Sequence, residues 1–239
     1  PTLMRYFLLS LSLLTTFLGS RSWGADDGPG PGSAADYQAT SPAYEPVVDV
    51  PGLPRVLLIG DSISVGYTVG VQERLAGIAN VHRVPQNAGP TSRGVENIDA
   101  WLGNGDWDVI HFNWGLHDIK YMDDDGERQV SEVDYAANLR LLIARMKKTG
   151  ATLIWCSTTP VPSGKLTASR QTEDAITYNA IAQAIMLEEG VMINDLYAFA
   201  LPQLEKLQRY QNVHFTTEGS AALAEQVAKS IEAALEKRR

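Results

Sequence analysis

Short apolar runs alternate with amphipathic stretches along most of the chain. Five runs predict strands because polar residues or glycines bound them, and they cover Val56–Ile59, Val81–Val84, Val109–Trp114, Ala151–Cys156 and Val191–Ile193. The stretches between the runs have helical spacing and predict helices over Val65–Ile78, Val95–Leu102, Asp134–Lys148 and Glu173–Glu189. A last helix is expected after Thr216, a good N-cap residue, and runs toward Leu235.

Strict alternation of strand and helix predicts a parallel sheet covered on both faces. We therefore expect an α/β fold of flavodoxin-like type, a three-layer α/β/α sandwich around a five-stranded parallel sheet. In such sheets the functional groups gather beyond the carboxyl ends of the strands. The polar residues that follow the five predicted strands are Ser62, Asn87 with Gly89, Gly115–Asp118, Thr158–Pro160 and Asp195.

A serine and a histidine at this edge point to nucleophilic chemistry. Ser62 closes GlyAspSer at 60–62, directly after the first strand, and His214 lies just before the last helix. A neutral imidazole can take the proton of a serine hydroxyl that attacks an ester carbonyl. The alternatives are a serine that only caps the following helix and a histidine that is only a surface residue.

These motifs resemble the SGNH/GDSL hydrolase superfamily over residues 54 to about 235. The resemblance assigns the nucleophile to Ser62 and the catalytic base to His214, in GlnAsnValHis at 211–214. It assigns one oxyanion donor to the backbone N–H of Gly89, in AsnAlaGly at 87–89, and the Ser62 amide is its natural companion. It also implies the flavodoxin-like SGNH hydrolase fold. The four motifs occur in the family's order at the predicted strand ends.

The third motif departs from the family pattern. The family has GlyXaaAsnAsp, and this chain has GlyLeuHisAsp at 115–118, so His117 replaces the asparagine that donates to the oxyanion. A ring N–H of His117 can fill that role. Alternatively, His117 orients the loop by bonding to Asp118.

The fourth motif lacks the family's acid. Gln211 stands where the aspartate of AspXaaXaaHis belongs, so an amide oxygen of Gln211 or Asn212 is expected to orient His214. Asp195 is another candidate, although it can equally cap the turn that follows it. A serine–histidine dyad oriented by a neutral group is the working mechanism.

Composition and charge narrow the function classes. A net charge of −8 and a pI near 5.0 argue against nucleic acid as a partner. The four histidines share no metal-ligand spacing, the first predicted strand is not followed by a glycine-rich phosphate loop, and we expect neither metal nor cofactor. The single Cys156 excludes an internal disulfide and is expected to be buried.

The N-terminal region predicts export. Residues 1–25 contain an apolar core between Tyr6 and Leu18 followed by small residues, which is typical of a secretory signal peptide. An uncleaved membrane anchor is the alternative, although the core is short for a membrane span. Residues 26–51 are rich in Gly and Pro and predict a linker, so the hydrolase domain is expected to occupy residues 52–239.

These features predict a secreted or periplasmic serine ester hydrolase. We expect it to cleave short, acetyl-type acyl groups from a carbohydrate or another small ester, with no stable membrane insertion after signal cleavage. Two alternatives remain: an acyl-lipid hydrolase of the lysophospholipase or thioesterase type, and a catalytically silent carbohydrate-binding descendant.

Overall fold

The computed structural model of the protein describes residues 41–122, 126–164, 166 and 169–238. The predicted signal peptide and most of the predicted linker lie outside these residues. The strands are β1 (Arg55–Ile59), β2 (Asn80–Arg83), β3 (Val109–Phe112), β4 (Thr152–Cys156) and β5 (Met192–Asn194). The longer helices are α2 (Ser62–Arg74), α3 (Thr91–Leu102), α4 (Glu132–Lys147), α5 (Thr172–Glu189) and α8 (Thr217–Glu236).

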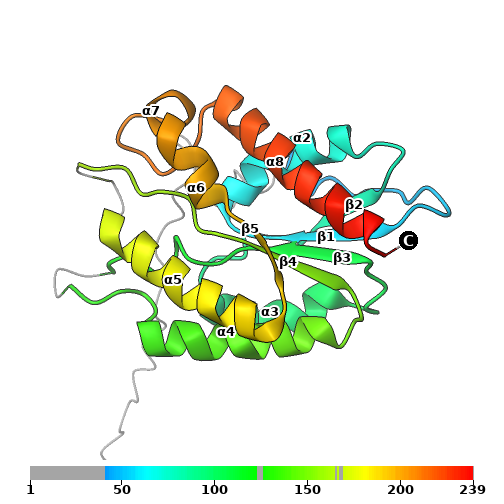
Figure 1. Ribbon diagram of the computed structural model, residues 1–239, viewed down its shortest axis with the longest axis horizontal. Coiled ribbons are helices and arrows are strands. Elements are labelled where there is room, and N and C mark those ends of the chain that lie inside the picture. The colour runs from blue at the N-terminus through cyan, green and yellow to red at the C-terminus, as the bar shows by residue number, and fades with distance from the viewer. Residues whose placement is uncertain (1–40, 123–125, 165, 167–168, 239) are drawn as a thin grey trace, which may run out of the picture.

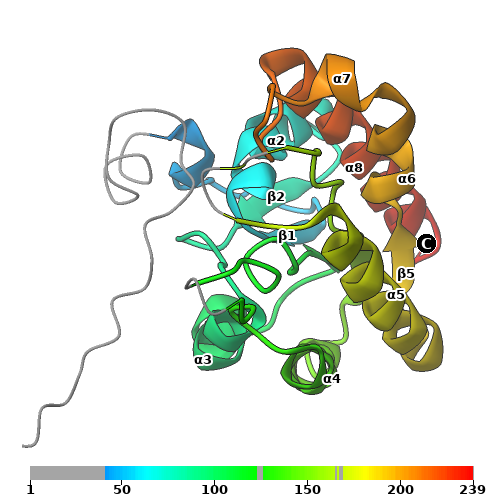
Figure 2. The ribbon, with the colours of Figure 1, turned by 90° about the vertical axis from the view of Figure 1, so that its left-hand side faces the viewer.

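The five strands form one parallel sheet in the order β2-β1-β3-β4-β5. Helices α2 and α8 cover one face, and α3, α4 and α5 cover the other (Figure 1). Figure 2 looks onto the edge where the strands end and shows the three layers. The predicted three-layer α/β/α sandwich with a five-stranded parallel sheet is therefore confirmed.

Strand β1 lies where a binding or active site is expected in a sheet of this topology. Its apolar run Val56–Ile59 is completely buried because helices cover both faces of the sheet. The chain leaves β1 to form β2 on one side and later returns to form β3 on the other. Such a switch point opens a crevice beyond the carboxyl end of the strand, and Ser62 lies there.

Two helices begin earlier than their apolar pattern predicts. Helix α2 begins at Ser62, not Val65, because the Asp61 side chain accepts a hydrogen bond from the Ile63 amide and caps the helix. Helix α3 begins at Thr91, not Val95, and its first amide donates to Asp118, which lies 27 residues downstream. Both caps bring polar groups to the carboxyl edge of the sheet.

The segment between β5 and α8 contains elements that the sequence pattern did not predict. Three short helical segments follow β5: α6 (Leu196–Ala200), the 3-10 helix η2 (Leu201–Gln203) and α7 (Leu204–Leu207). The chain then turns back on itself, and Gln208 pairs with Phe215 in an antiparallel bridge. A Cβ atom at Gly219, in the first turn of α8, would collide with the carbonyl group of Leu207. Glycine there lets the turn pack directly against α8.

Residues 41–51 pack against the domain. They begin with a 3-10 helix, η1 (Pro42–Tyr44), whose Ala43 is buried. The Val50 amide donates to the side chain of Asn80 at 2.8 Å, and Asp49 lies 2.5 Å from the ring of His82. Contacts with the sheet therefore extend N-terminal to Gly52, the position at which the sequence predicts that the domain begins.

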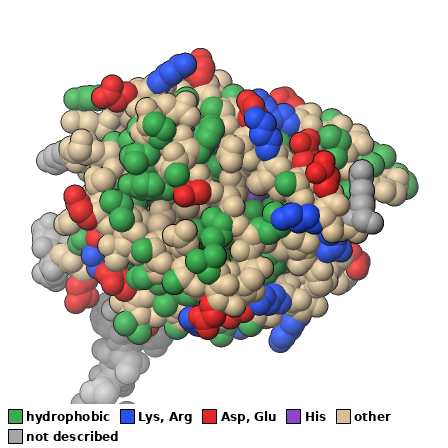
Figure 3. All heavy atoms as spheres, in the orientation of Figure 1, with side chains coloured by type: hydrophobic (Ala, Val, Ile, Leu, Met, Phe, Trp, Pro, Cys, Tyr) green, Lys and Arg blue, Asp and Glu red, His purple; other side chains and the backbone are tan. Residues whose placement is uncertain are grey.

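Several surface charges are paired between neighbouring helices. Arg140 and Lys147 of α4 form ion pairs with Glu188 and Glu189 at the end of α5. On the face that Figure 3 shows, several basic side chains lie next to acidic ones. Within the part of the chain that the structure describes, every helix is too short or too polar to cross a bilayer.

Candidate active site

The turn after β1 holds the Ser62 hydroxyl at the edge of the sheet. Asp61 caps α2, and Ser62 is the first residue of the helix, with 8% of its surface exposed. A Cβ atom at Gly60 would lie 2.6 Å from the Cβ of Ser64, so only glycine fits in this turn. The GlyAspSer sequence therefore fixes the local backbone as well as the hydroxyl.

Arg83, at the end of β2, holds the same turn from the neighbouring strand. Its guanidinium donates to the Gly60 carbonyl and to the Ser64 hydroxyl, each at 3.0 Å. The ring of Tyr44 covers the guanidinium at 5.0 Å. Arg83 is not among the site residues that the sequence predicts, although a charged residue near the end of a predicted strand was a usable signal.

Ser62 and His214 meet across the edge of the sheet. The Ser62 hydroxyl lies 2.9 Å from Nε2 of His214, and Nδ1 of the same ring lies 2.7 Å from Oδ1 of Asn212. Ser62 and His214 are both buried and are 152 positions apart in the chain. The structure therefore brings together the predicted serine, the predicted histidine and one of the predicted neutral partners.

The Asn212 contact determines which ring nitrogen of His214 carries the proton. Oδ1 of Asn212 also accepts a hydrogen bond from the backbone N–H of His214 at 2.8 Å. A backbone N–H can only donate, so this amide atom is the oxygen and accepts from Nδ1–H as well. Nε2 then presents a lone pair to the Ser62 hydroxyl, as a general base must.

A tight turn fixes His214 in this position. The Arg209 amide donates to the His214 carbonyl at 2.9 Å, and the Thr216 amide donates to the Leu207 carbonyl at 2.8 Å. The buried Gln208 side chain donates to the carbonyl groups of Val213 and Pro160. The turn is therefore tied both to itself and to the loop after β4.

The other two orienting candidates lie elsewhere. Gln211 has a φ of 46°, and its side chain packs against Gly164 in the loop after β4. Asp195 accepts from the Ala198 amide at 3.0 Å and from the Ser157 hydroxyl at 2.7 Å, so it caps α6. Of the three candidates, Asn212 is the one whose side chain contacts His214.

Two backbone amides are candidates for stabilising an oxyanion. The Ser62 amide is at the start of α2 and has no acceptor among the described residues. The Ala88 amide donates to the Gly60 carbonyl at 3.1 Å, which places the 87–89 turn beside the serine turn. The Gly89 amide donates to the Asn87 side chain at 2.9 Å, so it must share or exchange this acceptor to serve an oxyanion.

His117 and Asp118 do not bond to each other. Asp118 is fully buried, and its Oδ1 accepts from the Thr91 amide at 2.8 Å and from the Thr91 hydroxyl at 2.5 Å. Its Oδ2 has no hydrogen-bond partner among the described residues. The alternative in which His117 orients the loop by bonding to Asp118 therefore has no support in the structure, because the partner of the Asp118 carboxyl is Thr91, at the start of α3. His117 itself is 9% exposed.

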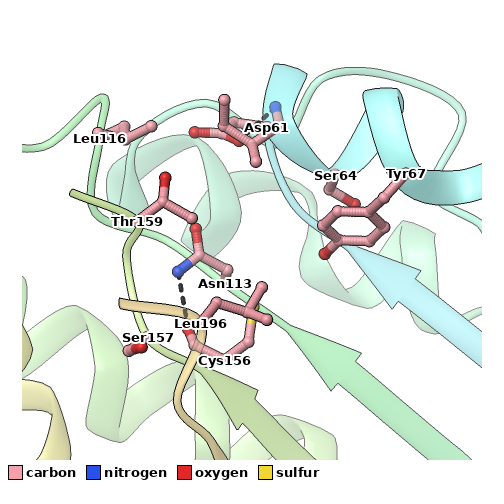
Figure 4. A pocket seen from close by; sticks show the side chains of 10 residues that line it. Asp61, Ser64, Tyr67, Asn113, Leu116, Cys156, Ser157, Thr159 and Leu196 are labelled. Carbon is pink, nitrogen blue, oxygen red and sulfur yellow. Dashed lines mark hydrogen bonds between the residues drawn. The ribbon is translucent and has the colours of Figure 1, made fainter. Parts of the chain in front are cut away.

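A narrow cavity lies behind the nucleophile turn (Figure 4). Asp61 and Leu116 border it on one side, and Asn113 and Thr159 on the other. The volume accessible to the centre of a water molecule is about 10 Å³, which is enough for about one water. The cavity can hold only a very small group.

Sequence and structure comparisons identify the family. The GDSL-like lipase/acylhydrolase family model matches residues 58–222, which contain Ser62, Gly89 and His214. The chain belongs to the GDSL-like lipase/acylhydrolase family. Its members hydrolyse acyl esters, and the chain is an ester hydrolase. No protein of curated function matches it.

Solved structures share the fold of this acylhydrolase at low sequence identity. An acetyl xylan esterase superposes with a TM-score of 0.63 at 16% identity, covering 74% of this chain and 99% of that one. The lipase/acylhydrolase of Enterococcus faecalis gives 0.64 at 19% identity, covering 76% and 96%. A variant of an acetyl-xylooligosaccharide esterase from Geobacillus gives 0.61 at 17% identity, covering 74% and 94%.

The described residues of this acylhydrolase contain no cluster of histidine, cysteine and carboxylate side chains that could hold a metal ion. His82 pairs with Asp49, and His111 is enclosed in the core, where burial lowers its pKa to about 3. Cys156 is buried at the end of β4, and burial raises the pKa of its thiol.

Asp118 should make the stability of this acylhydrolase depend on pH. Burial raises the pKa of Asp118 to about 7, against about 3.9 in an unfolded chain. Between these two pKa values the folded protein keeps a proton that the unfolded chain releases. The contribution of Asp118 to the free energy of unfolding therefore falls as the pH rises from about 4 to 7. The decrease is at most about 1.4 kcal/mol per pH unit.

Asp118→Asn retains an oxygen for Thr91 and removes the titration. Its free energy of unfolding relative to the unsubstituted protein should therefore increase from pH 4.5 to pH 7.5 in urea unfolding experiments. Parallel pH profiles for the two proteins would contradict the assignment.

Proposed function

We propose that the protein hydrolyses short, acetyl-type acyl esters, with a carbohydrate as the alcohol, through a Ser62–His214 mechanism. The observation that carries the proposal is the 2.9 Å hydrogen bond between Ser62 Oγ and His214 Nε2, with the lone pair of Nε2 directed at the hydroxyl. A serine hydroxyl is a weak nucleophile until a base in hydrogen-bond contact removes its proton.

The reaction proceeds in two halves. Oγ of Ser62 attacks the ester carbonyl carbon while Nε2 of His214 takes its proton, and the imidazolium then gives that proton to the leaving alcohol oxygen. Water enters with His214 again as the base, attacks the acyl-serine, and releases the acid and the free serine. Oδ1 of Asn212 keeps the hydrogen on Nδ1 throughout.

Negative charge on the tetrahedral oxygen requires donors. We assign this role to the backbone amides of Ser62 and Gly89, with His117 as the third donor in place of the family's asparagine. The Ser62 amide is suited to it because it lies at the positive end of α2 and has no acceptor among the described residues.

The proposed preference for a short acyl group and a sugar alcohol is supported by the names of two similar structures. Two structures with this fold are esterases named for acetyl xylan and acetylated xylooligosaccharides, although the low identities carry only the fold. An acyl-lipid hydrolase, the main alternative, needs a long apolar channel for its substrate.

The intact serine–histidine bond argues against a silent binding protein. Ser62→Ala should lower the turnover of p-nitrophenyl acetate at least about 1000-fold, because it removes the attacking atom. Thermal unfolding should change little, since the site is at the edge of the sheet. For the unsubstituted enzyme, kcat/KM should fall from the acetate to the octanoate ester. A faster octanoate ester would favour the acyl-lipid alternative, and an active Ser62→Ala protein would refute the mechanism.

A carboxylate at position 212 should accelerate the reaction. Asn212→Asp keeps the size of the side chain and places a negative charge 2.7 Å from Nδ1, which stabilises the imidazolium formed during attack. We expect kcat to rise about tenfold and the kinetic pKa of the histidine to rise by about one unit. Asn212→Ala should lower kcat.

Gln211→Asp is the matched control for this prediction. It introduces the same charge at the family's usual position, but the side chain there packs against Gly164. Its kcat should change less than about twofold, because the charge is held away from the ring. A faster Gln211→Asp enzyme together with an unchanged Asn212→Asp enzyme would show that Asn212 does not orient the base.

We also propose that the protein is exported and that residues 1–25 are removed. The apolar core between Tyr6 and Leu18, followed by small residues, supports this. After expression with this N-terminal region in a bacterial host, mass spectrometry of the secreted or periplasmic fraction should find a chain beginning near Gly24 or Ala25. An uncleaved chain that stays with the membrane fraction would support the anchor alternative.

A further inference from the structure

A groove leads away from the catalytic pair on the side of His214. Its inner end is a cavity that Ser62 and His214 line together with Gly66 and Ser220. The cavity continues outward along the start of α8, past Thr217, as a groove of about 270 Å³. The two parts share four residues, which are Gly66, Arg209, Phe215 and Ser220, so they form one continuous depression. We call it the α2/α8 groove.

The α2/α8 groove is narrow where small residues meet. A Cβ atom at Gly66 would lie 3.2 Å from the Ser220 hydroxyl, and one at Gly70 would lie 2.8 Å from the Cβ of Ala224. Larger side chains at these positions of α2 would fill the groove or push α8 away. The groove therefore has a floor of backbone and small polar groups along which an elongated group can lie.

Arg209 is the one charged residue that lines this groove in both of its parts. Its amide donates to the His214 carbonyl, and its Nε donates to the Phe215 carbonyl at 3.2 Å. The base of the guanidinium is therefore fixed by the same turn that fixes the catalytic histidine. The terminal nitrogens of the guanidinium point to no carboxylate among the described residues, and the side chain is exposed.

This arrangement differs from that of several other surface arginines. Arg55, Arg128 and Arg140, for example, each form an ion pair with an acidic side chain. A guanidinium that is positioned beside the proposed reacting atoms and has no acidic partner among the described residues is suited to bind a carboxylate through two parallel hydrogen bonds.

We propose that Arg209 binds a carboxylate on the alcohol part of the ester substrate, as in an acetylated uronic acid unit of a carbohydrate. This inference rests on the proposed function and narrows its substrate class. The alcohol lies on this side because the His214 imidazolium must protonate the leaving oxygen, and so the leaving group departs past His214. The acyl group then lies on the opposite side, beside the 87–89 turn that carries the proposed oxyanion donor Gly89.

Matched pairs of acetyl esters test this role. The probes are 3- and 4-acetoxybenzoate, whose leaving groups carry a carboxylate, and the corresponding methyl esters, whose leaving groups are neutral. The measured quantity is the ratio of kcat/KM for the anionic probe to that for the neutral probe. Differences in intrinsic reactivity cancel when this ratio is compared between proteins.

Arg209→Gln should lower the ratio about fivefold, because an exposed ion pair contributes about 1 kcal/mol. Arg209→Lys should lower the ratio less, because it keeps the charge. In the unsubstituted protein, raising the salt concentration should also lower the ratio. Lys206→Gln is the matched control because it removes the same charge from a residue of the neighbouring helix α7 that does not line the groove. It should change the ratio less than about twofold.

An unchanged ratio in Arg209→Gln would overturn the proposed role of Arg209. An equal decrease of the ratio in Lys206→Gln would overturn it too, because it would indicate only a long-range charge effect. The proposed function has a separate outcome. If the unsubstituted protein hydrolyses neither the neutral probes nor p-nitrophenyl acetate, the esterase proposal itself fails. If it hydrolyses these neutral esters and the ratio does not respond to position 209, only the substrate inference fails.

Discussion

The amide oxygen of Asn212 accepts two hydrogen bonds from one residue, and the tautomer of His214, the proposed base, depends on this contact. The backbone N–H of His214 holds the oxygen in place, and the same oxygen holds the proton on Nδ1. An amide turned the other way would donate to the ring and leave the proton on Nε2, where it could not accept from Ser62. Asn212 can therefore orient the proposed base as the family's acid would, although its neutral amide supplies no negative charge to the ring.

The rest of the fold serves to bring this histidine to a serine that is far away in sequence. The parallel sheet places Ser62 at the switch point beside β1, and α8 starts where the returning chain can pack on it. Glycine at position 219 lets the Leu207 carbonyl approach α8, and the turn that follows Leu207 carries His214. Arg83 and Asp118 contribute less directly. Arg83, at the end of β2, bonds to the turn after β1, and Asp118, in the loop after β3, bonds to the start of α3.

The sequence predicts the sheet well because its three central strands, β1, β3 and β4, contain buried apolar runs, which need no information from distant residues. It predicts less well where a distant group decides the outcome. The start of α3 depends on Asp118, and the short helices between β5 and α8 have no strong periodicity of their own. Spacing in the family motif pointed to position 211, but the positive φ of Gln211 turns its side chain toward Gly164. A single backbone angle thus transfers the contact to Asn212, and no pattern in the sequence reveals it.

Electrostatics links the missing acid to the proposed substrate. During attack His214 becomes positively charged beside a neutral amide, and the guanidinium of Arg209 lines the same cavity. Like charges that line one cavity disfavour each other, so the Arg209 guanidinium does not help to stabilise an imidazolium at His214. A carboxylate bound to Arg209 would offset this positive charge at the moment when the imidazolium forms. If this assignment holds, an anionic substrate supplies part of the negative charge that the family's aspartate otherwise provides. Substrate recognition and catalysis would then depend on the same turn of the chain, the one that carries Arg209 and His214.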